Sequence, residues 1–343
     1  MIDFSSLRSW TPDGGQARYE TIDMHTCGEP LRVIISGLPE IPGSTVLEKR
    51  RWFASHLDHV RTALMWEPRG HADMYGAVIT ASRNADFDLF FMHNEGYSTM
   101  CGHAVIALTR LVVESGMLPP NKFEILFDVP CGRISAVAHM ADGEVKASSF
   151  QNVPSYVVLS EAKIDVPGLG GVRLDIAYGG AYYAIVDAVA LGLGLDAANT
   201  DRLIDHGRRI KHAVAAAFPV EHPFEPDLSF IYGTIFTGPP SDAAHHSRNV
   251  CIFAHGEVDR SPTGSGVSAR AALHFARGDI ALGQVIRIES ILGATMDVRV
   301  VELTRFGGKA AIVPEVTGQA FFTGRGSFCV EPDDPFGDGF LLR

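Results

Sequence analysis

The sequence predicts an α+β fold that is built twice, as two similar halves. Short apolar runs bounded by turn-forming residues recur along the chain and indicate strands. Each half also contains one prominent apolar segment with helical spacing, and a glycine-containing loop leads into both of these helices. The 343 residues suit a chain of about two domains, given a usual size of roughly 150 residues for each.

In the first half, apolar runs alternate with turn residues and predict a set of short strands. The expected strands cover residues 18–38 as a pair, 76–92 as a pair, 123–129 and 133–140. Residues 47–66 have helical spacing and predict one helix, and residues 104–116 predict a second, buried helix that Gly116 could end. We expect residues 149–158 to be a crossover between the halves.

The second half repeats this plan. Residues 173–188 predict a hairpin with Gly179 and Gly180 near its turn, and residues 200–218 predict a long amphipathic helix capped by Thr200 or Asp201. Further strands are expected at residues 229–236, 249–255, 285–293, 296–303 and 309–318. A helix over residues 267–278, which Gly278 could close, takes the place of the buried helix of the first half.

A short internal repeat supports the duplication. Residues 100–107 align with residues 262–269, so that Gly102 falls on Gly264 and Cys101 falls on Thr263. The offset, 263 − 101 = 162, is nearly half of the chain. Each copy is a loop that becomes the first turn of an apolar helix, so the sequence predicts two equivalent helix starts.

Charge and composition exclude several functional classes. Lys and Arg number 29 and Asp and Glu number 40, which gives a net charge of −11. A nucleic-acid-binding surface needs clustered basic residues to neutralise phosphates, so this balance argues against one. No apolar stretch approaches the roughly 18 residues of a membrane span, and residues 1–15 lack the features of a signal peptide. We therefore expect a cytoplasmic protein whose partner is a small molecule.

One cysteine stands out by its position. Five cysteines are widely spaced and form no CxxC pair, so neither a disulfide framework nor a zinc site is predicted. Cys101 comes directly before the first apolar helix, where unpaired N–H groups and a partial positive charge lower the pKa of a thiol and bind anions. We expect Cys101 to be reactive. The others are expected to be structural: Cys27, Cys131, Cys251 and Cys329.

Several ordered motifs resemble the proline racemase family over about residues 18–340. They are residues 23–34 (DMHTCGEPLRVI), 67–78 (EPRGHADMYGAV), 98–108 (STMCGHAVIAL), 177–187 (AYGGAYYAIVD), 259–270 (DRSPTGSGVSAR) and 287–293 (RIESILG). The resemblance implies the diaminopimelate-epimerase-like fold, in which each half wraps a mixed sheet around a central helix and the active site lies in the cleft between them. Residues 1–153 would form the first half and 154–327 the second, and residues 328–343 either follow the second half or complete the first.

The sequence departs from the racemase pattern at Thr263. The family's racemases and hydroxyproline epimerases use no cofactor and place one cysteine at each helix start, on opposite faces of the substrate Cα. Thr263 stands where the second cysteine is expected, and a threonine hydroxyl is not a usable base near neutral pH. This pairing of Cys with Thr resembles the family's trans-3-hydroxy-L-proline dehydratases. It implies elimination of water, which needs a base on one face only.

The resemblance also assigns the site residues. Cys101 would remove the Cα proton and Thr263 would lie opposite it. Backbone N–H groups of matching positions would hold the substrate carboxylate, and two side chains would contact the ring nitrogen. The N–H positions are Gly102, His103, Gly264 and Ser265, and the ring-nitrogen contacts are His103 and Asp259. No cofactor and no metal are expected, and the resemblance implies a homodimer.

Several alternatives stay open at this point. Either Thr263 or His103 could assist departure of the C3 hydroxyl. The chain could instead be a proline or hydroxyproline racemase or epimerase with a non-cysteine second acid, or a non-catalytic module that binds proline-like ligands. A diaminopimelate epimerase normally needs two cysteines and is disfavoured.

The remaining motifs favour structural roles. We expect Cys27 to be structural or to support the site from outside it, and His25 and His71 to serve turns or packing. The pair His245–His246 lacks further ligands at metal spacing and is expected in a solvated loop. Gly179 and Gly180 do not follow the GxGxxG order, so no dinucleotide site is predicted.

Overall fold

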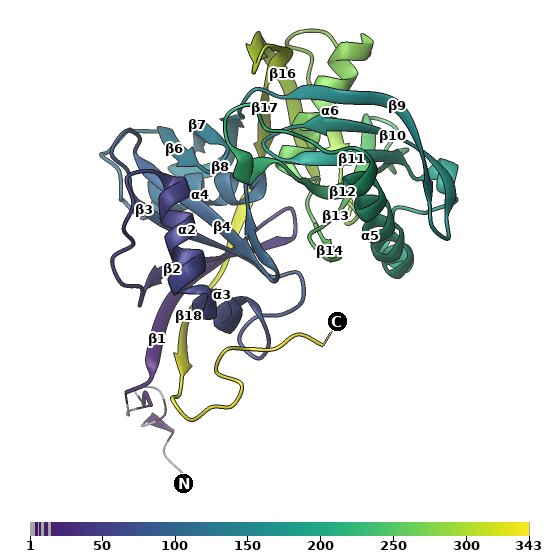
Figure 1. The fold of residues 1–343 in the computed structure, drawn as a ribbon. Coiled ribbons are helices and arrows are strands. Elements are labelled where there is room, and N and C mark those ends of the chain that lie inside the picture. The colour runs from purple at the N-terminus through teal and green to yellow at the C-terminus, as the bar shows by residue number, and fades with distance from the viewer. Residues whose placement is uncertain (1–3, 6, 8–9, 13–14, 343) are drawn as a thin grey trace.

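A computed structural model describes residues 15–342 and, before them, residues 4–5, 7 and 10–12. Two halves of similar architecture lie side by side, and each packs a helix against a curved sheet (Figure 1). This arrangement confirms the predicted α+β fold. Within the described residues, no helix has the length and apolar character that a membrane crossing requires.

The N-terminal half places one helix at the centre of its sheet. Its strands are β1 (Ala17–Thr26), β2 (Glu29–Ser36), β3 (Tyr75–Ala81), β4 (Phe87–His93), β5 (Gly96–Ser98), β6 (Glu124–Val129), β7 (Gly132–Ala141) and β8 (Glu144–Gln151). Its helices are α2 (Val46–His56), α3 (Asp58–Met65) and α4 (Gly102–Glu114). Helix α4 packs against β1, β7 and β8 and is buried on nearly every face as far as Val112. Its run of apolar residues therefore forms the core of this half.

The C-terminal half has the same plan. Its strands are β9 (Tyr156–Val166), β10 (Gly170–Tyr178), β11 (Tyr182–Asp187), β12 (Ile231–Gly238), β13 (Ser247–Phe253), β14 (Glu257–Val258), β15 (Ile286–Glu289), β16 (Thr295–Phe306) and β17 (Lys309–Gly318). Its α-helices are α5 (Thr200–Ala217) and α6 (Gly264–Arg277), with 3₁₀ turns at Val189–Leu191, Ala197–Asn199 and Pro226–Leu228. Helix α6 is the counterpart of α4 and packs against β9, β10, β16 and β17.

The strand pairings repeat between the halves. The parallel pair β2–β3 recurs as β11–β12, and the parallel pair β4–β6 recurs as β13–β15. The hairpin of β4 with β5 recurs as β13 with β14. Each pairing shifts by nine strands, so the internal repeat seen around the two helix starts extends through the topology of both halves.

Two pairings connect the halves. The last strand, β18 (Ala320–Val330), returns to the N-terminal half and pairs antiparallel with β1 along its whole length (Figure 1). The return therefore begins at Ala320, earlier than residue 328. Strand β17 of the C-terminal half pairs with β8 of the N-terminal half, so the two sheets are continuous.

The single helix predicted over residues 47–66 is wrong. The structure has two helices, α2 and α3, which meet at Leu57, where φ is −128° and ψ is 19°. The bend lets both helices bury apolar side chains, including Phe53 and Leu64, in the same cluster under the sheet. Helical periodicity reports the buried face of each helix but does not locate a change of axis between them.

The expected crossover at residues 149–158 is largely strand. Strand β8 extends to Gln151 and β9 begins at Tyr156, which leaves a short connection between them. Strand β8 contains several small or polar residues and is stabilised by its neighbours β7 and β17 on both sides, which a local pattern does not reveal.

The expected helix boundaries agree in part. Gly278 ends α6 in the left-handed conformation, with φ of +78°, as predicted. The N-cap of α5 is Asn199 instead of Thr200 or Asp201, because a 3₁₀ turn capped by Asp196 precedes the helix. Gly179 and Gly180 lie at the turn between β10 and β11, as expected.

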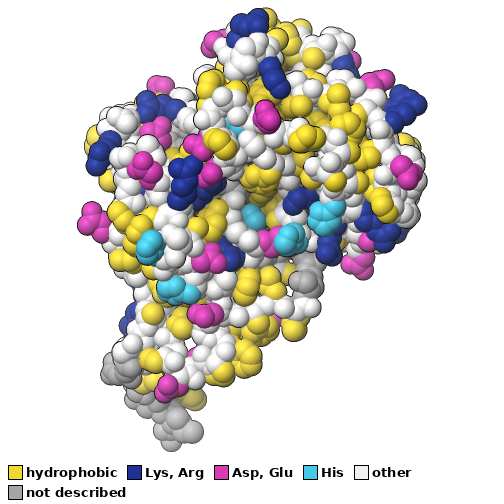
Figure 2. Space-filling model, in the orientation of Figure 1, with side chains coloured by type: hydrophobic (Ala, Val, Ile, Leu, Met, Phe, Trp, Pro, Cys, Tyr) yellow, Lys and Arg dark blue, Asp and Glu magenta, His cyan; other side chains and the backbone are white. Residues whose placement is uncertain are grey.

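Acidic and basic side chains are interspersed over the face of the molecule shown in Figure 2. The net charge of −11 is therefore not gathered into one acidic patch on that face.

Candidate active site

The starts of α4 and α6 meet where the two halves join. Gly102 begins α4 and Gly264 begins α6, and a Cβ atom placed on Gly102 would lie 2.6 Å from the Cα atom of Gly264. The unpaired N–H groups of both helix starts are therefore directed toward one region. That region is the one in which a small anion could be held from both sides.

A small closed cavity lies at this meeting point. It brings together all seven predicted site residues: Cys101, Gly102, His103, Asp259, Thr263, Gly264 and Ser265. Seven lining residues were not predicted: Glu29, Tyr75, Met100, Tyr183, Tyr232, Cys251 and Phe253. The free volume is about 20 Å³, which holds about one water molecule and is too small for a cyclic amino acid. Binding a ligand of that size requires the cleft to widen.

Ion pairs between the halves close the cleft. Arg51 of α2 binds Glu225 at 2.8 Å and Asp227 at 2.7 Å, both in the C-terminal half. Near the cavity, Arg260 binds Asp73 at 2.7 Å. Widening the cleft would therefore lengthen or break contacts of this kind.

Cys101 is the N-cap of α4 and is buried. Its Sγ atom lies 3.2 Å from Nδ1 of His103. Burial raises the pKa of the Cys101 thiol well above its usual 9.0; the N–H of Ala104 opposes the rise, and the carboxyl of Asp259 adds to it. The expected lowering of this pKa is wrong for the closed cavity, because the loss of solvation outweighs the field of the helix start.

His103 is neutral in this environment. Burial lowers the pKa of its imidazole to about 3, although a hydrogen bond with the Pro30 backbone opposes the shift. The ring packs edge-on against Tyr75 with centroids 4.8 Å apart, and the backbone carbonyl accepts a hydrogen bond from Thr26. A neutral imidazole beside Cys101 can orient the thiol but adds no positive charge to stabilise a thiolate.

Thr263 occupies the corresponding place before α6. Its φ of +67° lies in the left-handed region, which is rare for a β-branched residue. Its Oγ1 atom is buried in the cavity wall beside Asp259 and Cys251 and forms no hydrogen bond of good geometry with the described residues. Backbone strain and an unpartnered hydroxyl at one residue are typical of a functional site.

Two buried carboxyl groups face the same space. Asp259 accepts a hydrogen bond from the N–H of Ser261 at 2.7 Å, and Glu29 accepts one from the N–H of Arg260 at 2.7 Å. Burial raises the pKa of both carboxyl groups. Glu29, His103 and Asp259 each place one ligand-type atom within 4.8 Å of the others, so the cluster can hold an ammonium group or a metal ion.

Sequence reasoning missed Glu29. The residue lies inside the motif of residues 23–34, but a glutamate at the start of a strand carries no local sign that it faces the other half.

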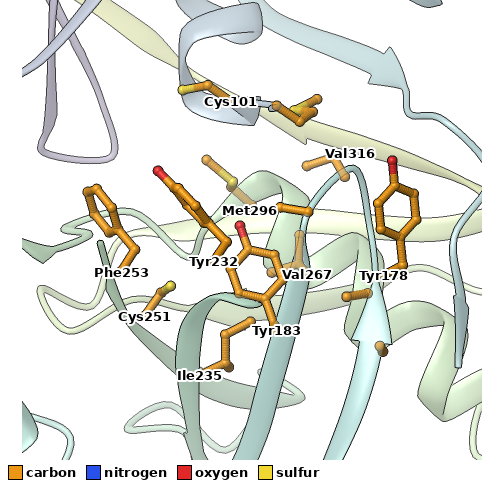
Figure 3. Close-up of a cluster of buried hydrophobic side chains, with 14 of the residues drawn as sticks. Cys101, Tyr178, Tyr183, Tyr232, Ile235, Cys251, Phe253, Val267, Met296 and Val316 are labelled. Carbon is orange, nitrogen blue, oxygen red and sulfur yellow. The ribbon is translucent and has the colours of Figure 1, made fainter. Parts of the chain in front are cut away.

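Aromatic side chains form the wall opposite Cys101. Figure 3 shows the hydroxyl groups of Tyr183 and Tyr232 pointing toward Cys101. The hydroxyl groups of Tyr183 and Ser265 are hydrogen-bonded, with 2.7 Å between their oxygen atoms. The ring of Tyr232 stacks on the ring of Phe253, and the two centroids are 5.5 Å apart. These rings limit the space for a ligand side chain and exclude water from the thiol.

Of the four remaining cysteines, one lines the cavity and three do not. Cys251 lines the cavity from β13 in the C-terminal half, although it was expected to be structural, and burial raises the pKa of its thiol. Cys27, Cys131 and Cys329 do not line the cavity. Cys27 donates to the carbonyl of Thr295, which accords with a structural role.

Three histidines that the sequence singled out, His25, His71 and His245, lie outside the cavity. His25 accepts a hydrogen bond from the N–H of Gly28, as a turn role predicts, and Nδ1 of His71 contacts the carbonyl of Ala72. His245 lies in a loop as expected, but it is half-buried. Its Nδ1 atom is hydrogen-bonded to Oε1 of Glu289 at 2.8 Å.

Comparison with known sequences gives one consistent family. The sequence model described as proline racemase matches residues 21–341. The chain is 50% identical to a trans-3-hydroxy-L-proline dehydratase from Colwellia psychrerythraea, over 98% of this chain and 97% of that protein. It is 45% identical to the human trans-3-hydroxy-L-proline dehydratase, over 96% of each chain. It is 44% identical to a 3-hydroxyproline 2-epimerase from Burkholderia multivorans, over 94% of this chain and 98% of that protein.

Solved structures agree with the sequence comparison. A hydroxyproline epimerase from Agrobacterium vitis with bound trans-4-hydroxy-L-proline superposes with a TM-score of 0.88 at 31% identity, over 95% of this chain and 96% of that one. A PhzF-family protein from Bacillus anthracis, at 11% identity and a TM-score of 0.58, shares the fold over 91% of this chain and 99% of its own. The two helix starts meet in the structure, and both carry motifs that resemble this family. Because the family model and these relatives match almost the whole chain, the chain belongs to the proline racemase family.

Proposed function

We propose that this protein dehydrates trans-3-hydroxy-L-proline to Δ1-pyrroline-2-carboxylate without a cofactor. The observation that carries the proposal is the pairing of one thiol, Cys101, with one threonine, Thr263, at the two helix starts. Relatives at 45% and 50% identity bear the corresponding name, which supports the same substrate.

The reaction begins at the substrate Cα. The Cys101 thiolate removes the Cα proton, and the developing charge spreads into the substrate carboxylate. Backbone N–H groups at the starts of α4 and α6 hold that carboxylate and stabilise its increased charge. Loss of the C3 hydroxyl gives an enamine, which tautomerises to the cyclic imine.

Binding and deprotonation are linked through charge. The secondary ammonium of the substrate would be bound between Asp259 and His103, where the buried carboxylate of Asp259 favours a cation. Its positive charge would offset the effect of Asp259 on the Cys101 thiol and favour the thiolate. The closed cavity would keep water away from the reacting atoms once the substrate is bound.

Epimerisation is the second candidate. Cys251 lines the same cavity from the half that carries Thr263, so its thiol is a possible second proton donor. The 44% identical relative from Burkholderia multivorans is named a 3-hydroxyproline 2-epimerase. A Cys251→Val variant distinguishes the two reactions. If Cys251 is the second proton donor, the variant should lose inversion at Cα and keep dehydration.

A coupled assay tests the proposed function. Purified protein receives trans-3-hydroxy-L-proline together with an NAD(P)H-dependent reductase that consumes the imine, and parallel samples receive L-proline or trans-4-hydroxy-L-proline and are read by chiral chromatography. Imine formation that is lost in Cys101→Ser and retained in the matched Cys329→Ser control supports dehydration. Stereoinversion alone would contradict it, and binding without turnover would favour a ligand-binding module.

We also propose a cytoplasmic homodimer. All five cysteines are free, which suits a reducing compartment. The exposed Phe321 and Phe322 side chains on β18 are candidates for a subunit contact. Sedimentation of the wild type and of Phe322→Ser tests the dimer.

A further inference from the structure

Two residues of the cavity wall, Thr263 and Glu29, each have a buried oxygen atom without a hydrogen-bond partner in the part of the chain that the structure describes, and in Glu29 that atom belongs to a carboxyl group. Glu29 is fully buried at the start of β2, and its Oε2 atom accepts the hydrogen bond from the N–H of Arg260. Its Oε1 atom has no hydrogen-bond partner among the described residues, and the side chain lines the cavity. A buried polar atom without a partner is costly, so its retention inside a ligand cavity points to a ligand.

The charges around Glu29 determine its protonation state. The guanidinium of Arg260 is bound to Asp73, and Glu29 accepts a hydrogen bond from the backbone N–H of Arg260. Both the charge and the N–H of Arg260 favour the ionised form of Glu29. Asp259 and the neutral His103 face it across the cavity. Burial and the nearby Asp259 raise the pKa of Glu29 well above its ordinary value. Because Oε2 accepts an N–H, Oε1 is the oxygen atom that is left to carry a proton when the carboxyl group is neutral.

We propose that Glu29 is the general acid that protonates the departing C3 hydroxyl group. This inference rests on the proposed dehydration and supplies a step that it needs, because hydroxide is a poor leaving group and water is a good one. Glu29 would donate from Oε1, the atom that the resting protein leaves without a partner.

Thr263 and His103, the two acids that the sequence left open, are weaker acids than Glu29, and Asp259 is needed as the charged partner of the substrate ammonium. Thr263 would have to give up an alcohol proton, and His103 is a neutral imidazole that would become an imidazolate. A neutral carboxylic acid is the stronger donor, and keeping it neutral by burial is an established way of providing an acid at neutral pH. Thr263 and His103 are therefore not needed as acids.

The stereochemistry of the substrate favours the same residue. In trans-3-hydroxy-L-proline the hydroxyl is trans to the carboxylate, so it lies on the same ring face as the Cα proton. Base and acid must then approach from one side. Cys101 and Glu29 both belong to the N-terminal half, and Thr263 belongs to the other half.

The step balances without a further reactant. The Cα–H bond breaks and its proton goes to Sγ of Cys101, while its electron pair forms the C2=C3 bond. The C3–O bond breaks with its electron pair on oxygen, which takes the proton from Oε1 and leaves as water. After the product departs, Cys101 loses one proton and Glu29 gains one, so the resting state is restored.

The Glu29→Gln variant tests the proposal, because removal of the Cα proton and protonation of the leaving hydroxyl can be measured separately in it. Exchange of the Cα proton for deuterium in D₂O, followed by mass spectrometry on L-proline, reports the Cys101 step alone. Dehydration of trans-3-hydroxy-L-proline reports both steps. We expect exchange to stay within a few-fold of wild type and dehydration to fall by about 10² to 10⁴, the usual contribution of a general acid. The analogue trans-3-chloro-L-proline, whose leaving group needs no proton, should be eliminated equally by both proteins.

Glu257→Gln is the matched control. Glu257 is also buried, and its Oε1 atom also accepts no hydrogen bond from the described residues, although it lies 3.5 Å from Nδ1 of His93; the residue does not line the cavity. Its substitution should leave exchange and dehydration unchanged. If wild type does not dehydrate the substrate at all, the proposed function fails, whatever Glu29→Gln does to exchange.

Three results would overturn the assignment of Glu29 while leaving dehydration intact. One is undiminished dehydration in Glu29→Gln. Another is a parallel loss of exchange and of chloride elimination, which would mean that Glu29 positions the site. The third is loss of wild-type activity with a chelator and recovery with a divalent cation, which would make Glu29, His103 and Asp259 a metal site. If Glu29→Gln does not fold, the solvent isotope effect on the wild-type protein is measured instead. It should be larger for the hydroxy substrate than for the chloro analogue, because only the hydroxy substrate needs a proton on its leaving group.

Discussion

Gly102 and Gly264 lie in backbone contact across the pseudo-symmetric join of the two halves. A Cβ atom on Gly102 would be 2.6 Å from the Cα atom of Gly264, and one on Gly264 would be 2.7 Å from the Cα atom of Gly102. Real Cβ atoms do not approach backbone this closely, so only glycine at both positions lets the two helix starts lie in contact. The glycine pair therefore sets the distance between the two sets of N–H groups that face the cavity.

Gly102→Ala should separate the helix starts and impair both stability and activity. The added methyl group meets backbone, which cannot rotate away, so we expect a cost of about 3 kcal/mol or more, the upper end for an overpacked core. Thermal unfolding and the dehydration assay measure the two effects. Gly171→Ala is the control because a Cβ there meets nothing within 4 Å. Equal melting temperatures for the two variants would contradict the role of the contact.

The sequence is informative about this join because the two helix starts resemble each other. The alignment of Gly102 with Gly264 and of Cys101 with Thr263 predicts that equivalent loops meet, and the structure brings them together. Local patterns also predict most strands, because alternation and turn residues lie within a few positions of each other.

What the sequence cannot supply depends on distant contacts. Glu29 faces Asp259 only because β2 and the loop before α6 come together in the fold, so nothing near residue 29 indicates an acid. The pKa of Cys101 is raised because aromatic side chains from both halves bury it, whereas the helix-start effect is local and was the only one visible in the sequence. The break at Leu57 likewise follows from packing on the sheet.

Thr263→Cys should add inversion at Cα to the activities of the protein. A thiol at this position would face Cys101 across the cavity, so one residue could remove the proton and the other could deliver one from the opposite face. Chiral chromatography after incubation with L-proline would detect D-proline. Thr263→Val is the control, with dehydration retained and no inversion. Absence of inversion in a folded Thr263→Cys protein would count against the one-base argument.

The activity of the free enzyme should rise with pH through the neutral range and beyond. Only the thiolate of Cys101 removes a proton, and burial raises the pKa of this thiol well above 9.0. Below that pKa, and as long as Glu29 keeps the proton that it donates, the thiolate fraction and with it kcat/KM should increase about tenfold per pH unit. Kinetics from pH 6 to pH 9 and the ultraviolet difference spectrum between wild type and Cys101→Ser check this. A plateau in kcat/KM below pH 8 would show instead that the protein stabilises the thiolate.

Glu289 should stabilise the C-terminal half in a pH-dependent way. Its side chain is 1% exposed and binds Arg248 at 2.7 Å, His245 at 2.8 Å and the N–H groups of Ser241 and Asp242 at 2.9 Å. Burial alone would raise the pKa of Glu289, but these N–H groups and His245 outweigh it and lower the pKa below its usual 4.5. The charged form is therefore the one that the fold favours.

Glu289→Gln should destabilise the protein by about 3 kcal/mol at pH 7, because it leaves Arg248 with a weaker buried partner. A carboxyl whose pKa is lower in the folded state contributes fully above its unfolded pKa, about 4.3, and loses the contribution as the pH falls through its folded pKa. The difference between wild type and variant should therefore shrink below pH 4. Urea unfolding at pH 7, 5 and 3.5 measures it, with the exposed Glu144→Gln as control. A difference that is constant over this range would mean that Glu289 acts through its shape and not through its charge.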